Sequence, residues 1–423
     1  MLPVVSKMQA KLSMMRICFF STVTYWHGIK GGMEIHGKLL SEGLVKRGHG
    51  VTVISSRNPS NIDFEEKNGI SINYLRNTTF GSKRKNWPIA SRNKFLELNK
   101  ENPFNIILSQ QSSAYGFPQS LLEKNKIPLV TRVAGTQLDM LISVYNQTLN
   151  LKRGFLELFK EILRTFYNYF LVELPLYHKS TELIVVSHHL ADSLKKFYFI
   201  NQKKINLVFH GTNTEIFKPD KKSGYFVRDK YGISTGSKVL LIASTVSRQK
   251  GFNIALTAFK EILSIHSNMK LLVVGDGVYL EDLKRLADQF GIQNNVIFTG
   301  HVSNDEISGF YNASDIFLLP TLRVEGFPRV LIEAMSCGKP VVASRIGGIL
   351  SIIDDNKNGL LITPGNVSEL VEKVLFLLKN EAFGSQLADN ARKEVIKKFS
   401  LDKMLEKTIK VFETAIEHTQ GQG

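Results

Sequence analysis

The stretch Pro320–Met335 (PTLRVEGFPRVLIEAM) follows a short apolar run and carries two glutamates, Glu325 and Glu333, which stand eight positions apart. Pro328 favours the start of a helix, and eight residues span about two helical turns, so both carboxylates can face one ligand. Carboxylates accept paired hydroxyl groups, and the N–H groups of a first helical turn are free to bind phosphate or hydroxyls. The stretch therefore predicts a ligand site where a strand passes into a helix.

The rest of the chain repeats this order of strand, loop and helix. Short apolar runs alternate with segments of helical periodicity, which is typical of βαβ units and parallel sheets. The apolar runs are Ile17–Thr22, Val51–Ser55, Ile70–Leu75, Asn105–Ser109, Leu129–Val133, Leu183–Val186, Ile205–Phe209, Val239–Ala243, Lys270–Gly275, Val296–Thr299, Asp315–Leu319, Pro340–Ser344 and Gly359–Ile362. The pattern predicts an α/β protein of two doubly wound domains that face one another across a cleft.

The domain boundary is expected near the middle of the chain. The 423 residues exceed what one hydrophobic core usually organises. The polar segment Phe217–Gly224 (FKPDKKSG) has the composition of a linker between domains. We therefore expect one domain over residues 1–215 and a second over residues 216–398.

Charge is the unusual feature of the composition. The chain has 54 Lys and Arg residues against 38 Asp and Glu residues, a net charge of +16. Residues 1–215 hold 28 basic and 15 acidic residues, so 28 − 15 = +13 of this charge lies in the first half. Hydrophobic residues make up 43% of the chain, which excludes collagen-like and disordered classes.

Two further classes are excluded. Cys18 and Cys337 are too few for a disulfide framework, which favours a reducing compartment. No run reaches about 18 apolar residues, so we predict no transmembrane helix. Arg16 interrupts the N-terminal apolar run that would otherwise mimic a secretory signal.

Residues 150–177 do not follow the alternation of strands and helices. Apolar side chains recur there at helical spacing, with Lys152, Arg153, Lys160 and Arg164 among them. The apolar positions are Phe155, Leu158, Phe159, Ile162, Leu163, Phe166, Tyr169 and Phe170. Such a helix either lies on an anionic membrane surface or is a crossover helix packed on its own sheet.

A second basic segment, Gly81–Lys94 (GSKRKNWPIASRNK), has the composition of a loop. We expect Trp87 within it to be exposed. The segment either contacts phosphate or lipid headgroups or is simply solvated.

Other glycines and basic residues follow predicted strands. Gly31 and Gly32 stand between the first strand and a helix over Met33–Arg47. Lys250, with Arg248 before it, precedes another helix and can neutralise a diphosphate. Gly275 opens a third such turn. Because ligands of open α/β sheets bind at the carboxyl ends of strands, these turns belong to candidate sites.

With these motifs in this order, the chain resembles the family 4 glycosyltransferases, which are retaining enzymes of the GT-B fold with a nucleotide-sugar donor. The resemblance runs from about Met15 to Phe399. Its motifs are Gly31-Gly32, Lys46-Arg47-Gly48-His49, Ser187, Lys250-Gly251, Gly275-Asp276-Gly277, the Glu325 and Glu333 pair, the segment Ala334–Ala343 and Gly347-Gly348.

The resemblance implies roles for individual residues. Glu325 and Lys250 would be the catalytic pair, Glu325 contacting the donor sugar and Lys250 offsetting charge on the departing nucleoside diphosphate, while Glu333 holds the ribose. The other donor-binding positions are Gly31, Gly32, Thr245, Arg248, Gly275, Gly326, Phe327, Pro328, Arg329 and Val330. Gly135 and Thr136 would lie on the acceptor side, and residues 399–423 would form a helix that crosses back to the N-terminal domain. No metal and no cofactor are expected.

The function implied is transfer of a sugar from a UDP- or GDP-sugar to a lipid-linked or polysaccharide acceptor in cell-surface glycan biosynthesis. We expect a cytoplasmic protein that lies peripherally on the inner face of the cytoplasmic membrane and does not bind nucleic acid. The basic N-terminal half would meet the anionic membrane and the acceptor.

Three positions depart from the family pattern. Thr245 stands where the family usually has an arginine, Ala134 where it often has a histidine, and His210–Asn213 replaces a common Asn-Gly-Val-Asp. Two alternatives therefore stay open. One is a catalytically weakened, glycosyltransferase-like binding protein, and the other is a nucleotide-sugar epimerase of the same fold.

Overall fold

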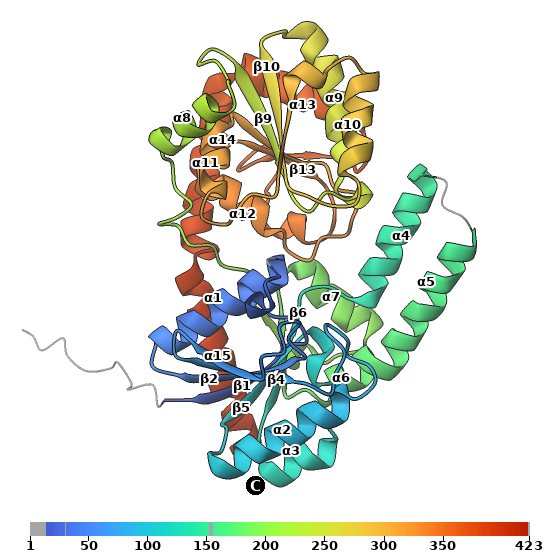
Figure 1. The fold of residues 1–423 in the computed structure, drawn as a ribbon, viewed down its shortest axis with the longest axis vertical. Coiled ribbons are helices and arrows are strands. Elements are labelled where there is room, and N and C mark those ends of the chain that lie inside the picture. The colour runs from blue at the N-terminus through green and yellow to red at the C-terminus, as the bar shows by residue number, and fades with distance from the viewer. Residues whose placement is uncertain (1–13, 30, 152–154, 422–423) are drawn as a thin grey trace, which may run out of the picture. The chain divides into compact units, whose positions relative to one another are not determined.

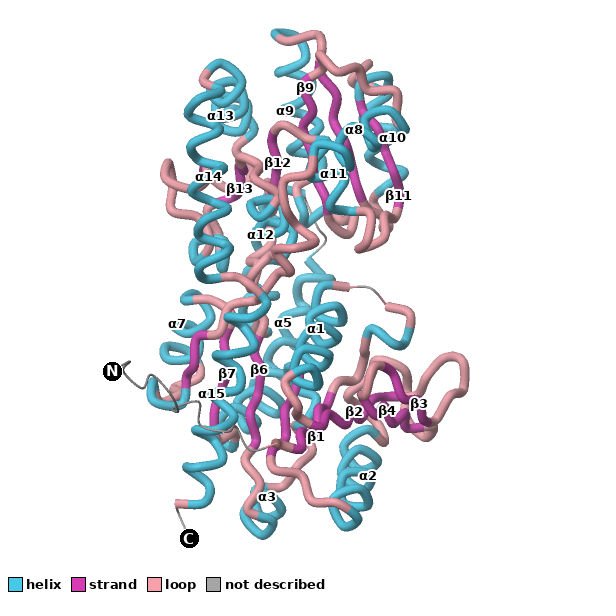
Figure 2. The backbone as a smooth tube through the Cα atoms, turned by 90° about the vertical axis from the view of Figure 1, so that its left-hand side faces the viewer, coloured by secondary structure: helices cyan, strands magenta, loops and turns pink. Residues whose placement is uncertain are grey.

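The computed structural model describes residues 14–29, 31–151 and 155–421 (Figure 1). The chain divides into two compact units. Unit 1 comprises Met1–Arg132, Val172–Ile184 and Thr408–Gly423, and unit 2 comprises Val133–Leu171 and Val185–Lys407. Two mainly parallel sheets with helices around them give the expected mixed α/β architecture (Figure 2).

The first sheet has the strand order β3-β4-β2-β1-β5-β6-β7-β8. Its strands are β1 (Arg16–Phe20), β2 (Gly50–Ser56), β3 (Phe64–Lys67), β4 (Ile70–Leu75), β5 (Ile106–Gln110), β6 (Leu129–Val133), β7 (Glu182–Val185) and β8 (Ile205–Leu207). β1 pairs in parallel with both β2 and β5, whereas β3 runs antiparallel to β4.

Helices cover both faces of this sheet because successive residues of a strand point to opposite faces. The first-half helices are α1 (Gly32–Lys46), α2 (Trp87–Glu101), α3 (Gln119–Asn125), α4 (Gln137–Leu151), α5 (Phe155–Asn168), α6 (Leu174–Lys179) and α7 (His188–Phe197), with a π-helical turn at Tyr169–Glu173. In β1, the Phe19 ring lies beside Gly37 of α1. The ring of the next residue, Phe20, packs against Phe95 of α2, with ring centroids 6.3 Å apart.

The structure corrects the expectation for Gly81–Lys94. Helix α2 begins at Trp87, inside the segment, and Trp87 is fully buried. Its indole N–H donates to the Ser113 carbonyl oxygen at 2.8 Å. An indole with an internal acceptor loses little on leaving water, so this tryptophan is a core residue.

The second sheet has the order β11-β10-β9-β12-β13-β14 and is parallel throughout. Its strands are β9 (Lys238–Ala243), β10 (Met269–Val274), β11 (Val296–Gly300), β12 (Ile316–Leu319), β13 (Val341–Ser344) and β14 (Leu360–Ile362). The helices are α8 (Lys221–Lys230), α9 (Phe252–Ile265), α10 (Leu280–Gln289), α11 (Ile307–Ala313), α12 (Arg329–Ser336), α13 (Val367–Lys379), α14 (Glu381–Lys398) and α15 (Leu401–Gln420).

These helices fall into two groups, as a doubly wound sheet requires. Helices α9, α10 and α13 pack together, and α8, α11, α12 and α14 form the other group (Figure 1). Helix α8 begins inside the segment Phe217–Gly224, with Asp220 as its N-cap, so half of the predicted linker is helical.

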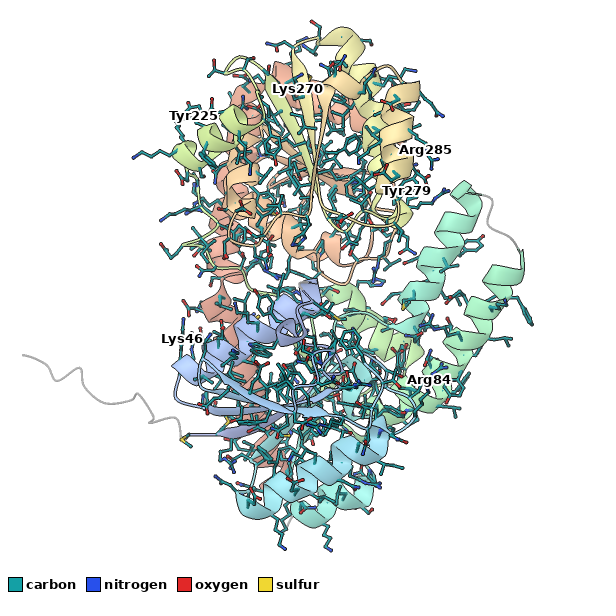
Figure 3. The ribbon with its side chains drawn as sticks, in the orientation of Figure 1. Lys46, Arg84, Tyr225, Lys270, Tyr279 and Arg285 are labelled. Atoms are coloured by element: carbon teal, nitrogen blue, oxygen red, sulfur yellow. The ribbon has the colours of Figure 1, made fainter. Side chains whose placement is uncertain are left out.

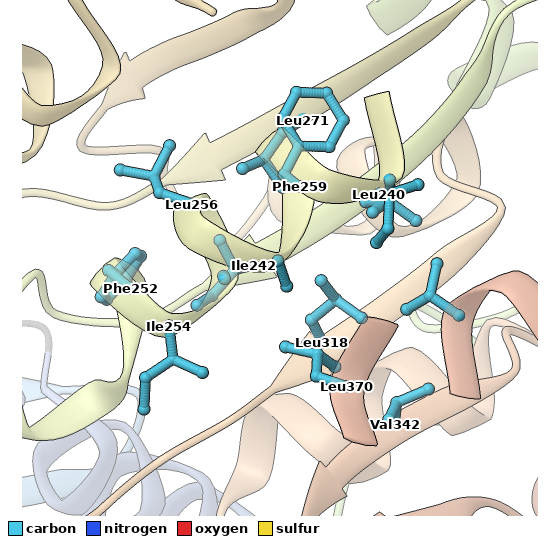
Figure 4. Packing of buried hydrophobic residues seen from close by; sticks show 14 of the residues in the cluster. Leu240, Ile242, Phe252, Ile254, Leu256, Phe259, Leu271, Leu318, Val342 and Leu370 are labelled. Atoms are coloured by element: carbon cyan, nitrogen blue, oxygen red, sulfur yellow. The ribbon is translucent and has the colours of Figure 1, made fainter. Parts of the chain in front are cut away.

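The core of unit 2 lies between its sheet and α9 (Figure 4). Alternate strand residues such as Leu240 and Ile242 point toward Phe252 and Phe259 of α9, and all four are at most 1% exposed. Burial of this apolar surface is the main term that stabilises the unit.

No helix in the described part of the chain is long and apolar enough to span a bilayer.

We predict that Phe259→Ala destabilises the protein by about 3–5 kcal/mol, because it leaves a cavity in a closely packed core. Ile265→Ala, at the exposed end of the same helix, serves as the control and should change stability by less than about 0.5 kcal/mol. Thermal unfolding followed by circular dichroism measures both. Equal losses of stability in the two variants would contradict this account of the core.

Candidate functional site

The centre of the site in unit 2 is an ion pair between Lys250 and Glu325. The Lys250 Nζ atom lies 2.6 Å from Glu325 Oε1. Lys250 ends a 3₁₀ turn that follows β9, and Glu325 lies in the loop that follows β12. β9 and β12 are neighbouring parallel strands, so their carboxyl ends deliver both residues to one edge of the sheet.

Two loops are tied together around this pair. The Gln249 carbonyl oxygen accepts hydrogen bonds from the Leu322 N–H at 2.9 Å and from the Thr321 hydroxyl at 3.1 Å. The same hydroxyl lies 3.2 Å from Glu325 Oε1. The backbone before Lys250 and the backbone before Glu325 therefore hold each other in place.

Glu325 is ionised although it is only 7% exposed. Burial alone would raise the pKa of this carboxyl group. The charges of Lys250 and Arg323 and the hydrogen bonds from Lys250 and Thr321 outweigh burial, and they lower the pKa of Glu325 below its ordinary value. In the described part of the chain these bonds all go to Oε1, so the other oxygen, Oε2, is left for a ligand.

Glu333 is the fifth residue of α12, about one turn from its start, and it is also buried. Its Oε1 atom pairs with Arg329 Nη2 at 2.7 Å, and its Oε2 atom accepts a hydrogen bond from the Tyr311 hydroxyl at 3.0 Å. Burial and the neighbouring Glu333 charge raise the pKa of Tyr311, which keeps that phenol a donor. Arg329 and Glu333 stand four residues apart on α12, the spacing at which helical side chains meet.

Close backbone contacts shape the loop of Glu325. The Gly348 N–H donates to the Glu325 carbonyl oxygen at 2.6 Å. A Cβ atom at Gly348 would lie 1.8 Å from the Gly326 carbonyl oxygen, so only glycine fits there. At Gly275, whose φ is +132°, a Cβ atom would lie 1.9 Å from the Ser244 carbonyl oxygen. These contacts explain why the sequence has glycine at both positions.

The remaining residues of the predicted stretch line the same turn. Pro328 is the N-cap of α12, as expected from its place before the helix. Phe327 is buried, with its ring centroid 5.4 Å from that of Phe209. Arg329 and Val330 form the first residues of the helix and are partly buried.

Two other predicted donor-binding residues lie between β9 and Lys250. Thr245 is exposed. The Arg248 guanidinium lies 3.3 Å from Asp282 and 4.9 Å from the centre of the Tyr279 ring. Asp282 also binds Arg285, and Tyr279 and Arg285 are labelled together beside α10 in Figure 3. Arg248 therefore has partners of its own on α10.

Gly31 and Gly32 lie in unit 1, where β1 is followed by α1. Gly31 is the N-cap of α1, and Gly32 is its first residue. Neither has a side chain to cap the helix, and the carboxylate of Glu34 accepts a hydrogen bond from its own backbone N–H in the first turn. Glu34 follows in the same turn, and burial raises its pKa.

The predicted acceptor-side residues lie at the carboxyl end of β6, in unit 2. The Thr136 hydroxyl and N–H both donate to Asp139 Oδ2, at 2.8 and 3.0 Å, and this cap begins α4. Gly135 precedes it and is partly buried. Ala134, one residue earlier, touches the Glu325 loop, because a Cβ atom on Gly326 would lie 1.9 Å from the Ala134 carbonyl oxygen.

A histidine that we did not predict as functional joins this group. His189 Nε2 lies 2.8 Å from Asp139 Oδ1, and this hydrogen bond raises the pKa of His189. His189 is the second residue of α7, directly after β7, whereas Asp139 belongs to the cap after β6. The spacing of Thr136 and Asp139 indicates a helix cap, but no sequence signal links either residue to His189.

Among the residues that the structure describes, no three histidine, cysteine, aspartate or glutamate side chains are grouped closely enough to hold a metal ion.

Two family models match the chain over consecutive segments. The model described as Glycosyltransferase Family 4 matches residues 30–216, and the model described as Glycosyl transferases group 1 matches residues 225–394. The first segment includes Gly31, and the second includes Lys250, Glu325 and Glu333.

Three similar proteins align with nearly the whole chain. An uncharacterized glycosyltransferase of Methanocaldococcus jannaschii is 26% identical, over 92% of this chain and 96% of its own. The N-acetyl-alpha-D-glucosaminyl L-malate synthase of Bacillus anthracis is 27% identical, over 89% and 92%. The alpha-monoglucosyldiacylglycerol synthase of Streptococcus pneumoniae is 25% identical, over 93% and 91%.

Solved structures agree on the fold. Sucrose-phosphate synthase from Thermosynechococcus elongatus has a TM-score of 0.79 at 18% identity, covering 96% of this chain and 100% of its own. Anabaena HepE, solved in complex with UDP and glucose, has a TM-score of 0.72 at 17% identity, covering 95% and 100%. The chain belongs to the family 4 glycosyltransferases and has their GT-B fold.

Proposed function

We propose that this protein is a retaining glycosyltransferase that moves a sugar from a UDP- or GDP-sugar to a lipid-linked or polysaccharide acceptor in cell-surface glycan biosynthesis. The observation that carries the proposal is the ion pair between the partly buried Lys250 and the buried Glu325 at the carboxyl edge of the second sheet. A cation for a leaving diphosphate and a carboxylate for sugar hydroxyls stand side by side there.

Lys250 has the capacity for a second partner. Its ammonium group has three protons, and one acceptor, Glu325 Oε1, binds it among the described side chains. The other two protons can bind phosphate oxygens of the donor. As the bond between the anomeric carbon and the diphosphate breaks, negative charge grows on the leaving oxygen, and a fixed cation stabilises that charge.

Glu325 would bind the donor sugar through its second oxygen. Since its lowered pKa keeps it ionised at neutral pH, it accepts hydrogen bonds from sugar hydroxyls rather than donating to them. Lys250 and Thr321 fix the orientation of the carboxylate, so the sugar meets a preorganised acceptor.

The transfer step needs no protein nucleophile. The acceptor hydroxyl would attack the anomeric carbon on the face from which the diphosphate leaves, which retains the configuration. The new bond joins the acceptor oxygen to the anomeric carbon, and the proton of the hydroxyl passes to the leaving phosphate oxygen.

Glu333 would hold the ribose of the nucleotide. Each carboxylate oxygen accepts two hydrogen bonds, so ribose hydroxyls can be added to the bonds from Arg329 and Tyr311. Those two partners keep Glu333 in one orientation before the nucleotide arrives.

The acceptor class is supported by one relative that aligns with most of the chain. The S. pneumoniae protein is named for synthesis of a glucosylated diacylglycerol, a membrane lipid. The basic N-terminal half of this chain suits an acceptor on an anionic membrane. The B. anthracis relative is named for a small acid, malate, which provides the alternative acceptor for the test.

An assay of nucleoside diphosphate release tests the proposal. UDP- and GDP-sugars are each incubated with the protein and with diacylglycerol, a polyprenyl-linked glycan or malate. We expect UDP or GDP to be released in the presence of a lipid acceptor, with the anomeric configuration retained when the product is examined by NMR. Tight nucleotide binding without turnover would show the alternative, a binding protein, and an inverted product would refute retention.

We predict that Lys250→Ala and Glu325→Gln each lower kcat by about 10²–10³, because each removes a charge that acts on the transition state. Lys284→Ala and Glu281→Gln are matched controls, since these residues form an exposed pair on α10 at 2.8 Å. The controls should retain the wild-type rate. Wild-type rates in the Lys250 and Glu325 variants would overturn the assignment of the catalytic pair.

We also predict a pH-dependent contribution of Glu325 to stability. A carboxylate with a lowered pKa stabilises the folded state above its ordinary value of 4.5, and this contribution is lost as pH falls through the folded-state pKa. The Tm advantage of the wild type over Glu325→Gln should therefore shrink as the pH is lowered below about 4.5. An advantage that stays constant or grows in acid would contradict the predicted direction.

A further inference from the structure

The strongest unexplained feature of the surface is the segment Lys195–Lys204 (KKFYFINQKK), at the end of α7 and in the loop that follows. It contains four lysines and no acidic residue, and of these lysines Lys195 pairs with Asp192 of α7 at 2.7 Å. Buried and exposed residues alternate here: Tyr198 and Ile200 are buried, whereas Phe197 and Phe199 are exposed. The buried pair anchors the segment, and the exposed pair points away from the core.

Phe199 is exposed to solvent, and its backbone has an unfavourable conformation. It is 76% exposed, and its φ is +54°, in the left-handed region where a bulky residue is strained. The N–H groups of Tyr198 and Ile200 both donate to the Leu194 carbonyl oxygen, at 3.2 and 3.1 Å, and fix the turn. Glycine or asparagine suits this position after a helix better, so packing does not explain the phenylalanine.

A second apolar surface lies on α5 and the π-helical turn. Phe159, Leu163, Phe166 and Phe170 are spaced at i, i+4, i+7 and i+11, which places them on one stripe of the helix. Each of the four is 48–55% exposed. Residues 150–177 were expected to form either a helix on a membrane surface or a crossover helix packed on its own sheet. Packing on the sheet does not account for these four side chains, because they are exposed to solvent.

The two surfaces are joined within unit 2. The Tyr169 hydroxyl donates to the Phe197 carbonyl oxygen. The Tyr169 ring centroid lies 4.8 Å from that of Phe170 and 4.8 Å from that of Tyr198. We use the name aromatic–basic surface for Phe166, Phe170, Phe197 and Phe199 together with Lys195, Lys196, Lys203 and Lys204.

We propose that the aromatic–basic surface docks the protein on an anionic lipid bilayer. Aromatic rings partition into the interface between lipid headgroups and acyl chains, and lysines around them bind the headgroups. Phe197 and Phe199 stand between two pairs of lysines, so both kinds of contact form at once. A second copy of this chain fits less well, since it would bring four lysines against four others.

This inference deepens the proposed function and rests on it, because a docked enzyme gains most when its acceptor is a membrane lipid. Docking itself is measured without turnover, so its failure and the failure of the proposed function are separate results.

Co-sedimentation with vesicles tests the proposal. The full chain is mixed with vesicles of phosphatidylcholine and phosphatidylglycerol or with vesicles of phosphatidylcholine alone. We expect binding to the anionic vesicles that weakens as salt is added, and little binding to the neutral ones. Binding that ignores both salt and lipid charge would overturn the proposal, as would sedimentation of the protein without vesicles, which indicates self-association.

Two variants locate the contact. Phe199→Asn relieves the strained turn, so we expect an unchanged or higher Tm and vesicle binding that is about tenfold weaker. Lys196→Gln combined with Lys203→Gln should weaken binding roughly 20-fold and lower its salt dependence. The double variant keeps the test decisive if Phe199→Asn alters the fold.

Phe226→Asn is the matched control, because Phe226 on α8 is 70% exposed but lies outside the aromatic–basic surface. It should bind vesicles like the wild type. All variants should transfer sugar to a water-soluble acceptor at the wild-type rate. Equal loss of binding in Phe226→Asn and Phe199→Asn would overturn the choice of surface.

Discussion

The site depends on a buried carboxylate that stays charged. Moving an ion out of water costs several kcal/mol unless a partner and hydrogen bonds compensate. For Glu325 the compensation comes from Lys250 and Thr321, which reach it from the ends of two strands that neighbour each other in the sheet. The parallel pairing of β9 and β12 therefore matters for the chemistry, because it brings Lys250 and Glu325 to the same edge of the sheet.

The same edge of the sheet is held together by backbone contacts that leave no room for side chains. Gly348 lies against Gly326, and Gly275 lies against Ser244. Such contacts fix the loops without adding polar groups that would compete with a ligand. A charged pair that must meet the substrate in one orientation benefits from loops that cannot shift, since preorganised charge needs no rearrangement during the reaction.

The sequence predicted the parts of this protein that follow from local pattern. Every apolar run that we identified became a strand, because a buried parallel strand is apolar throughout. The strand β3 was not predicted, because its residues FEEK form an exposed edge and are mostly polar. Asn68 and Gly69, which lie between β3 and β4, are a hairpin signal that could have indicated it. Trp87 was wrongly expected to be exposed, because its partner Ser113 is distant in sequence. The pairing of His189 with Asp139 depends on tertiary contact in the same way.

Part of the excess positive charge is concentrated in one segment, Lys195–Lys204, where the fold does not require it. Four of the 28 basic residues in residues 1–215 lie within Lys195–Lys204, around an exposed ring on a strained turn. Stability would favour fewer like charges and a glycine there. The segment has both the like charges and the strained phenylalanine, and Tyr169 connects it to an exposed aromatic helix. A binding partner that is absent from the isolated chain explains these features better than stability does. That partner must be anionic to suit the lysines and must offer an apolar phase to suit the rings, and a lipid bilayer has both properties.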